Sequence, residues 1–113
     1  MPKSSPPSPR GPRYTALANT LTNVGWISEG YVQDRGAGAG GPHYQWTRKV
    51  KGKTVSVALS QAQYAWLKTA IENWRRLQAT LKEMQRLSRE ELFDTIPGPV
   101  RKKRLSKAVL GTN

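Results

Sequence analysis

Cysteine is absent from the 113 residues, and a single histidine is present. Without thiols the chain can form neither a disulfide nor a zinc site built on thiolates. His43 has no second histidine or cysteine for a metal site, and Tyr44 beside it lacks the several arginines and histidines that surround a catalytic tyrosine in a recombinase. No apolar run approaches the length of about 20 residues that spans a bilayer. These absences predict a protein without metal, enzymatic activity or membrane contact.

A nucleotide cofactor is not expected either. Gly36, Gly38 and Gly41 spell G-x-G-x-x-G, but Pro42 and a predicted strand follow them. A dinucleotide site needs a helix at that point, because its N-terminal amides meet the pyrophosphate. The glycines therefore indicate a flexible loop.

Acidic residues are scarce, and the formal net charge is +12, from 19 lysines and arginines against 7 aspartates and glutamates. Such an excess attracts polyanions. The positive charge is concentrated in the two ends of the chain and in residues 43–59, which contain no acid. We therefore expect a nucleic-acid partner, with DNA favoured over RNA, and a cytoplasmic, nucleoid-associated location.

Composition divides the chain into three parts. Residues 1–14 are rich in proline and serine and predict a disordered basic tail. Residues 15–96 are expected to form a single α+β domain, and residues 97–113 a basic C-terminal tail. Within the domain, Leu17 and Leu21 indicate a short helix, and the aromatic and β-branched residues of 25–35 indicate a strand.

Residues 43–59 predict a β-hairpin. Lys51 and Gly52 fit a two-residue turn, because glycine readily adopts the positive φ that such a turn needs. With Val50 opposite Lys53, Tyr44 faces Leu59, and the apolar residues gather on one face of the hairpin.

A long helix is expected to follow the hairpin. Ser60 and Gln63 form a capping box, and apolar residues then recur at three- and four-residue spacing into the high eighties. A second capping box at 88–91 predicts a new short helix, which Pro97 and its neighbours end. The predicted fold class is α+β: a small antiparallel sheet, made of the hairpin plus one strand, packed on one long helix, with disordered basic tails. The 60–88 helix is also a candidate surface for a homodimer.

Positive side chains on the hairpin, helix and C-terminal tail are the candidate binding residues. A two-stranded ribbon fits the DNA major groove, and a flexible basic tail contacts phosphates without reading sequence. The candidate nucleic-acid-binding residues are Gln45, Thr47, Arg48, Lys49, Lys51, Lys53, Arg75, Arg76, Arg101, Lys102, Lys103 and Arg104.

Two motifs resemble a family of small uncharacterised prokaryotic proteins, a domain of unknown function often encoded near transposases. The motif residues are Gly41, Pro42, Tyr44, Trp46, Arg48, Lys49, Val50, Gly52, Lys53 and Thr54 in the hairpin, and Ile71, Asn73, Arg75, Arg76 and Leu77 in the helix. The resemblance covers roughly residues 20–90 and implies a link to mobile elements. Many relatives carry a cysteine knuckle before the hairpin, which QDRGAGAGG replaces here.

The sequence thus predicts a non-enzymatic DNA-binding protein, acting as a mobile-element accessory or a small regulator through its basic hairpin and tails. Two alternatives remain open. One is a protein-interaction module that binds a transposase or a ribonucleoprotein through the long helix. The other is a protein that binds structured RNA or associates with the ribosome.

Overall fold

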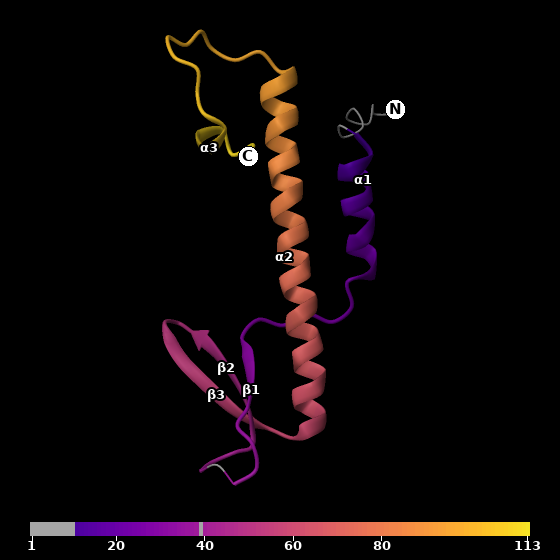
Figure 1. Cartoon of the computed structure of the whole chain (residues 1–113), viewed down its shortest axis with the longest axis vertical. Helices are drawn as coiled ribbons and strands as arrows, with labels where there is room; N and C mark the ends of the chain where they lie inside the picture. The colour runs from indigo at the N-terminus through magenta and orange to yellow at the C-terminus, as the bar shows by residue number, and fades with distance from the viewer. Residues whose placement is uncertain (1–10, 39) are drawn as a thin grey trace. The chain divides into compact units, whose positions relative to one another are not determined.

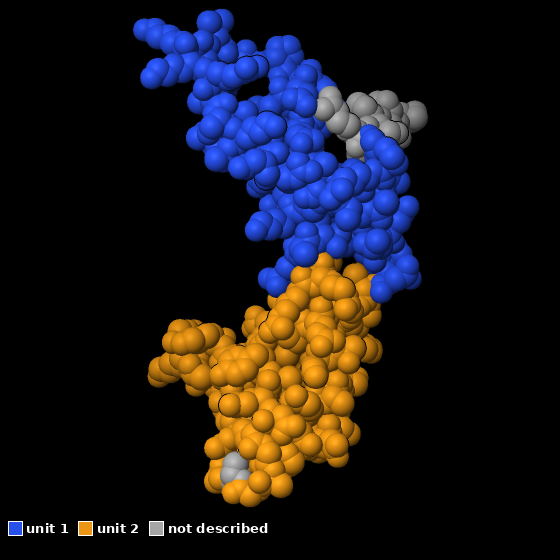
Figure 2. All heavy atoms as spheres, in the orientation of Figure 1, with its two compact units in different colours: residues 1–23, 78–113 blue, residues 24–77 orange. Residues whose placement is uncertain are grey.

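In a computed structural model of the chain, residues 11–38 and 40–113 are described, and the chain divides into two compact units. Unit 2 comprises residues 24–77, and unit 1 comprises residues 1–23 together with 78–113 (Figure 2). One helix, α2 (Gln61–Thr95), contributes residues to both units (Figure 1).

The sheet of unit 2 is antiparallel and consists of β1 (Tyr31–Asp34), β2 (Tyr44–Val50) and β3 (Lys53–Leu59), in the order β1-β2-β3. The predicted hairpin is confirmed to the residue, with Tyr44 opposite Leu59 and Val50 opposite Lys53. Lys51 and Gly52 both have positive φ, 51° and 80°. A type I′ turn requires positive φ at both central positions, so the turn uses the left-handed region at a lysine as well as at the glycine.

The strand that the sequence predicts over 25–35 is shorter in the structure and begins only at Tyr31. Residues 24–30 instead form an irregular segment that is hydrogen-bonded to α2. The Ser28 amide donates to the Ala70 carbonyl at 3.2 Å, and Asn73 Nδ2 donates to the Trp26 carbonyl at 2.9 Å. Because these backbone groups are hydrogen-bonded to α2, they are not available to pair with β2. The strand prediction was therefore wrong for residues 25–30.

The first half of α2 meets the sheet, which makes this an α+β protein as the sequence predicts. The rings of Tyr44 on β2 and Tyr64 on α2 lie 4.8 Å apart between centroids. Ala70 and Ile71 on α2 are buried, and Thr47 is the one other buried residue in the described part of the chain. The core is therefore small, and many large apolar side chains remain exposed.

The N-terminus of α2 has the predicted capping box. Ser60 Oγ accepts from the Gln63 amide at 3.1 Å, and Gln63 Oε1 accepts from the Ser60 amide at 3.0 Å. The second predicted start, at Ser88, is wrong, because α2 continues without a break to Thr95. The helix contains neither glycine nor proline, so nothing in its backbone favours a stop before Pro97.

The N-terminal part of unit 1 is helical over residues that the sequence assigns partly to a tail and partly to a short helix. Helix α1 (Gly11–Thr20) is followed by a 3-10 turn, η1 (Leu21–Asn23). Residues 11–14 of the predicted tail are thus helical, whereas its first ten residues lie outside the described part. Pro12 falls in the first turn of α1, where a proline is tolerated because the amide it lacks would have no partner in the helix.

The C-terminal segment also contains structure that the predicted tail lacks. Helix α3 (Lys107–Leu110) is capped by Ser106, whose hydroxyl accepts from the Val109 amide at 3.2 Å, and ends at Gly111 with φ 74°. The Thr112 carbonyl accepts from Arg86 Nη1 of α2 at 3.2 Å. Residues 106–112 are therefore folded against α2 within unit 1.

Charged groups connect the parts of unit 1. Arg86 donates from Nε and Nη2 to the two oxygens of Glu83, at 2.9 and 2.8 Å, and from Nη1 to Glu90 at 2.7 Å. Arg13 of α1 donates from Nε to Glu83 Oε2 at 2.9 Å. The hydrogen bonds from Arg86, followed by the charges of Arg86 and Arg13, lower the pKa of Glu83 from 4.5 to about 2.

We expect Ser60→Ala to lower the free energy of unfolding by about 1 kcal/mol, because it removes the acceptor for an N-terminal amide of α2. The matched control is Ser88→Ala, which lies inside the helix and should change stability by less than about 0.5 kcal/mol. Urea unfolding followed by circular dichroism measures both. Equal losses in the two variants would mean that a helix does start at Ser88.

Glu83→Gln should lower the melting temperature at neutral pH, where the carboxylate is charged and bonded to both arginines. The folded-state pKa is depressed, so this stabilisation is complete above pH 4.5 and is lost as the pH falls from there through about 2. The difference between wild type and variant should therefore shrink across this window. Glu72→Gln removes a helix carboxylate outside the network and should show no such trend. A difference that stays constant down to pH 2 would contradict the assignment.

Candidate nucleic-acid interface

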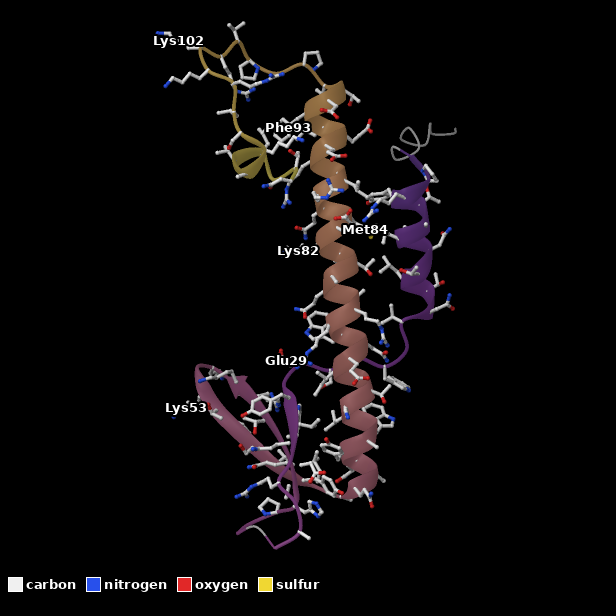
Figure 3. All side chains as sticks on the ribbon, in the orientation of Figure 1. Glu29, Lys53, Lys82, Met84, Phe93 and Lys102 are labelled. Atoms are coloured by element: carbon white, nitrogen blue, oxygen red, sulfur yellow. The ribbon has the colours of Figure 1, made fainter. Side chains whose placement is uncertain are left out.

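A shallow open pocket of about 520 Å³ lies in unit 2 where β1 begins. Because Tyr31 pairs with Thr47 and β1 starts there, the last residues of β2 have no β1 partner. The chain before β1 turns toward α2 instead, and Figure 3 shows Glu29 beside that helix. The pocket is lined by Glu29, Gly30, Tyr31, Thr47, Arg48, Lys49, Thr54 and Arg75.

At the pocket, the backbone of Gly30 passes very close to Trp46 and Thr47 of β2. A Cβ atom at this position would lie 2.6 Å from Trp46 Nε1 and 2.7 Å from the Thr47 carbonyl oxygen, and φ is 98°. Only glycine is compatible with both the conformation and the contact. Trp46 Nε1 donates to the Glu29 carbonyl at 3.1 Å, so the indole fixes the segment that it passes.

Arg48 is held by the same indole. Its guanidinium carbon lies 4.9 Å from the Trp46 ring centroid, which is within the range of a cation–π interaction. Its Nε is buried and has no hydrogen-bond partner. A buried donor without a partner costs free energy. The oxygen of a bound anion would supply that partner.

Lys49 and Arg75 complete the positive side of the pocket. Three cations, Arg48, Lys49 and Arg75, face one carboxylate, Glu29. The planar guanidinium binds phosphate oxygens in pairs, and the lysine adds a mobile point charge. Two guanidinium groups and one lysine around a pocket are suited to binding a phosphate group.

Two other predicted hairpin residues lie outside the pocket lining. Lys51 and Lys53 are exposed at the turn, and Figure 3 shows Lys53 at the edge of the hairpin. Their charges extend the positive surface beyond Lys49.

The remaining predicted hairpin residues, Gln45 and Thr47, are less exposed than the lysines of the turn. Gln45 is half-buried, and Thr47 is 8% exposed with its hydroxyl 3.1 Å from Ser56 Oγ. The central strand of the sheet has neighbours on both sides, and these cover Thr47. Thr47 lines the pocket, and its contact with nucleic acid stays a prediction.

The other predicted cations lie elsewhere. Arg76 is exposed and donates to Asn73 Oδ1 at 2.5 Å, so it does not line the pocket with Arg75. In unit 1 the four tail cations are exposed: Arg101, Lys102, Lys103 and Arg104. They form a separate positive segment from the hairpin group.

Sequence reasoning missed Glu29, Gly30 and Tyr31 as site residues. Gly30 interrupts the run of β-forming residues in 25–35, and an isolated glycine in such a run is a known sign of close backbone approach. That sign was available in the sequence. The role of Glu29 was not, because it depends on the path of the chain toward α2.

Other candidate chemistry is sparse in the described residues. His43 Nε2 lies 3.0 Å from Asp34 Oδ1, and its ring stacks on Tyr44 at 4.1 Å between centroids. No group of three metal-binding side chains occurs in residues 11–38 and 40–113. Over the same residues, no helix has the length and apolar character of a membrane span.

Gly30→Ala should destabilise unit 2 by more than about 1 kcal/mol, because alanine disfavours positive φ and its Cβ would overlap Trp46 and Thr47. Gly40→Ala is the matched control, since a Cβ at Gly40 meets no atom within 4 Å. Urea denaturation measures the effect. If both variants unfold at the same urea concentration as wild type, the approach at Gly30 is not a structural requirement.

Comparison of the chain with protein-family models, with curated protein sequences and with solved structures finds no match in any of the three. The candidate interface is the pocket beside Gly30, whose lining includes Arg48, Lys49 and Arg75.

Proposed function

We propose that the protein binds DNA without catalysing a reaction on it, and that the pocket beside Gly30 holds a backbone phosphate. The observation that carries this proposal is the convergence of Arg48, Lys49 and Arg75, from a strand and a helix, on one open pocket. Cations that two elements bring to one pocket bind an anion better than isolated surface charges, because the attractions of several charges act on it together, and Trp46 already holds one of them, Arg48, in place.

The unpaired Arg48 Nε supports the same function. Trp46 holds the guanidinium from one side, and the buried Nε–H lacks an acceptor. A phosphate oxygen would accept a hydrogen bond from this Nε–H. The bond would be charge-assisted, and such bonds are stronger than neutral ones. Lys51 and Lys53 would then contact neighbouring phosphates along the same backbone.

The basic C-terminal segment adds affinity of a different kind. Arg101, Lys102, Lys103 and Arg104 are exposed, and the chain as a whole carries +12. Such charges release condensed counterions from DNA whatever its sequence, which makes binding strongly salt-dependent. The pocket would set where the DNA backbone lies on the protein, and the C-terminal cations would raise the overall affinity.

The test compares two double variants with the same change in net charge. Lys49→Glu with Arg75→Glu places two acids in the pocket, and Lys68→Glu with Lys82→Glu places two acids at exposed positions of α2 outside it. We expect the pocket variant to bind a short DNA duplex at least about tenfold more weakly than the control variant. The slope of log affinity against log salt should fall by about 2, since two phosphate contacts are lost.

Fluorescence anisotropy from about 50 to 200 mM salt supplies both quantities. Circular dichroism checks that both variants remain folded. Equal weakening in the two variants would mean that DNA binding depends only on the net charge of the protein and that the pocket has no specific part in it. Wild-type protein that fails to bind DNA at the lowest salt would end the proposal altogether.

A further inference from the structure

Two tryptophans form an exposed aromatic pair on unit 2. Trp26, in the segment before β1, is 74% exposed, and Trp66 on α2 is 53% exposed. Their ring centroids lie 6.2 Å apart with an interplanar angle of 38°. Tryptophan is the side chain with the largest apolar surface, so leaving two of them together in water needs a reason.

The pair is held in place by polar contacts beside it. Asn73 Nδ2 donates to the Trp26 carbonyl at 2.9 Å, and Asn73 Oδ1 accepts from Arg76 Nη2 at 2.5 Å. Asn73 therefore links the backbone of one tryptophan to a guanidinium. Gly25, with φ 78°, allows this approach, because a Cβ there would lie 3.3 Å from Asn73 Nδ2.

One cation, Arg76, lies beside the pair. The helical spacing places Trp66, Thr69, Asn73 and Arg76 on one side of α2, and Glu72, four residues before Arg76, borders that side. Rings with a neighbouring cation suit a nucleobase, whose flat face stacks on the indole while its phosphate meets the guanidinium. A purely apolar partner would make no use of Arg76, whose hydrogen bond to Asn73 holds it next to the pair.

We propose that Trp26 and Trp66 form a stacking platform for the unpaired bases of single-stranded DNA, with Arg76 contacting the adjacent phosphate. This inference rests on the proposed DNA binding and adds a second site to it. Trp66 and Arg75 are nine residues apart, which is about two and a half helical turns, so the platform and the phosphate pocket occupy opposite sides of α2. Each site can therefore be removed without the other.

The experiment uses the full chain and titrates it with a short oligo(dT) strand, an oligo(rU) strand and a DNA duplex. The variant is Trp26→Ala with Trp66→Ala, and the matched control is Trp26→Phe with Trp66→Phe, which keeps two stacking rings. We expect the alanine variant to bind oligo(dT) about tenfold more weakly and to lose most of the tryptophan quenching that binding causes. The duplex affinity should stay within twofold of wild type, and the phenylalanine variant should keep most of the oligo(dT) affinity.

Several results would overturn the platform. One is oligo(dT) binding that the alanine variant retains in full. A second is wild-type binding to oligo(rU) that is tighter than to oligo(dT), which would make RNA the ligand. A third is a wild-type dimer in sedimentation that the alanine variant turns into a monomer while DNA binding is unchanged, which would make the pair a contact between copies. The two proposals fail in different ways. Loss of the pocket lowers duplex affinity in the Lys49→Glu, Arg75→Glu variant, whereas loss of the platform lowers oligo(dT) affinity in the double alanine variant.

Discussion

The architecture of unit 2 depends on the contact between Gly30 and Trp46. Because Gly30 has no side chain, the backbone before β1 can pass within bonding distance of the indole, which donates to the Glu29 carbonyl. That hydrogen bond sets where β1 begins, and the start of β1 leaves the end of β2 open on one side. The pocket and the position of Arg48 over the ring lie at this approach, and the hydrogen bonds of Ser28 and Trp26 with α2 direct the path of residues 24–30.

The same path separates two kinds of surface. Before Gly30, the chain presents Trp26 beside Trp66, where the exposed area is aromatic. From Glu29 onward, it borders the cations of the hairpin and Arg75. Neighbouring residues on α2 take part in different surfaces: Arg75 lines the pocket, whereas Arg76 is bonded to Asn73. One helix thus contributes to two different surfaces because adjacent residues on it point about 100° apart.

The hairpin could be predicted fully from the sequence, because its turn residues and its alternating pattern admit one register, and a slip of one residue would exchange the faces. The cap at Ser60 was equally readable. The same motif at Ser88 was misleading, since a capping box starts a helix only where the preceding chain is not already helical. Helix α3 was missed because it is short and its cap at Ser106 follows a run of positive charge. The cations of the pocket could be identified from the sequence of the hairpin and the helix. Their arrangement around one pocket could not, because it depends on the irregular segment 24–30, which has no periodic pattern.

The small number of buried side chains has a thermodynamic consequence. The heat-capacity increment of unfolding grows with the apolar area that unfolding exposes, and only Ala70 and Ile71 are buried apolar residues in the described part of the chain. A small increment gives a broad, flat dependence of stability on temperature. A ligand that binds only the folded chain would add to this stability by mass action across the whole of that temperature range.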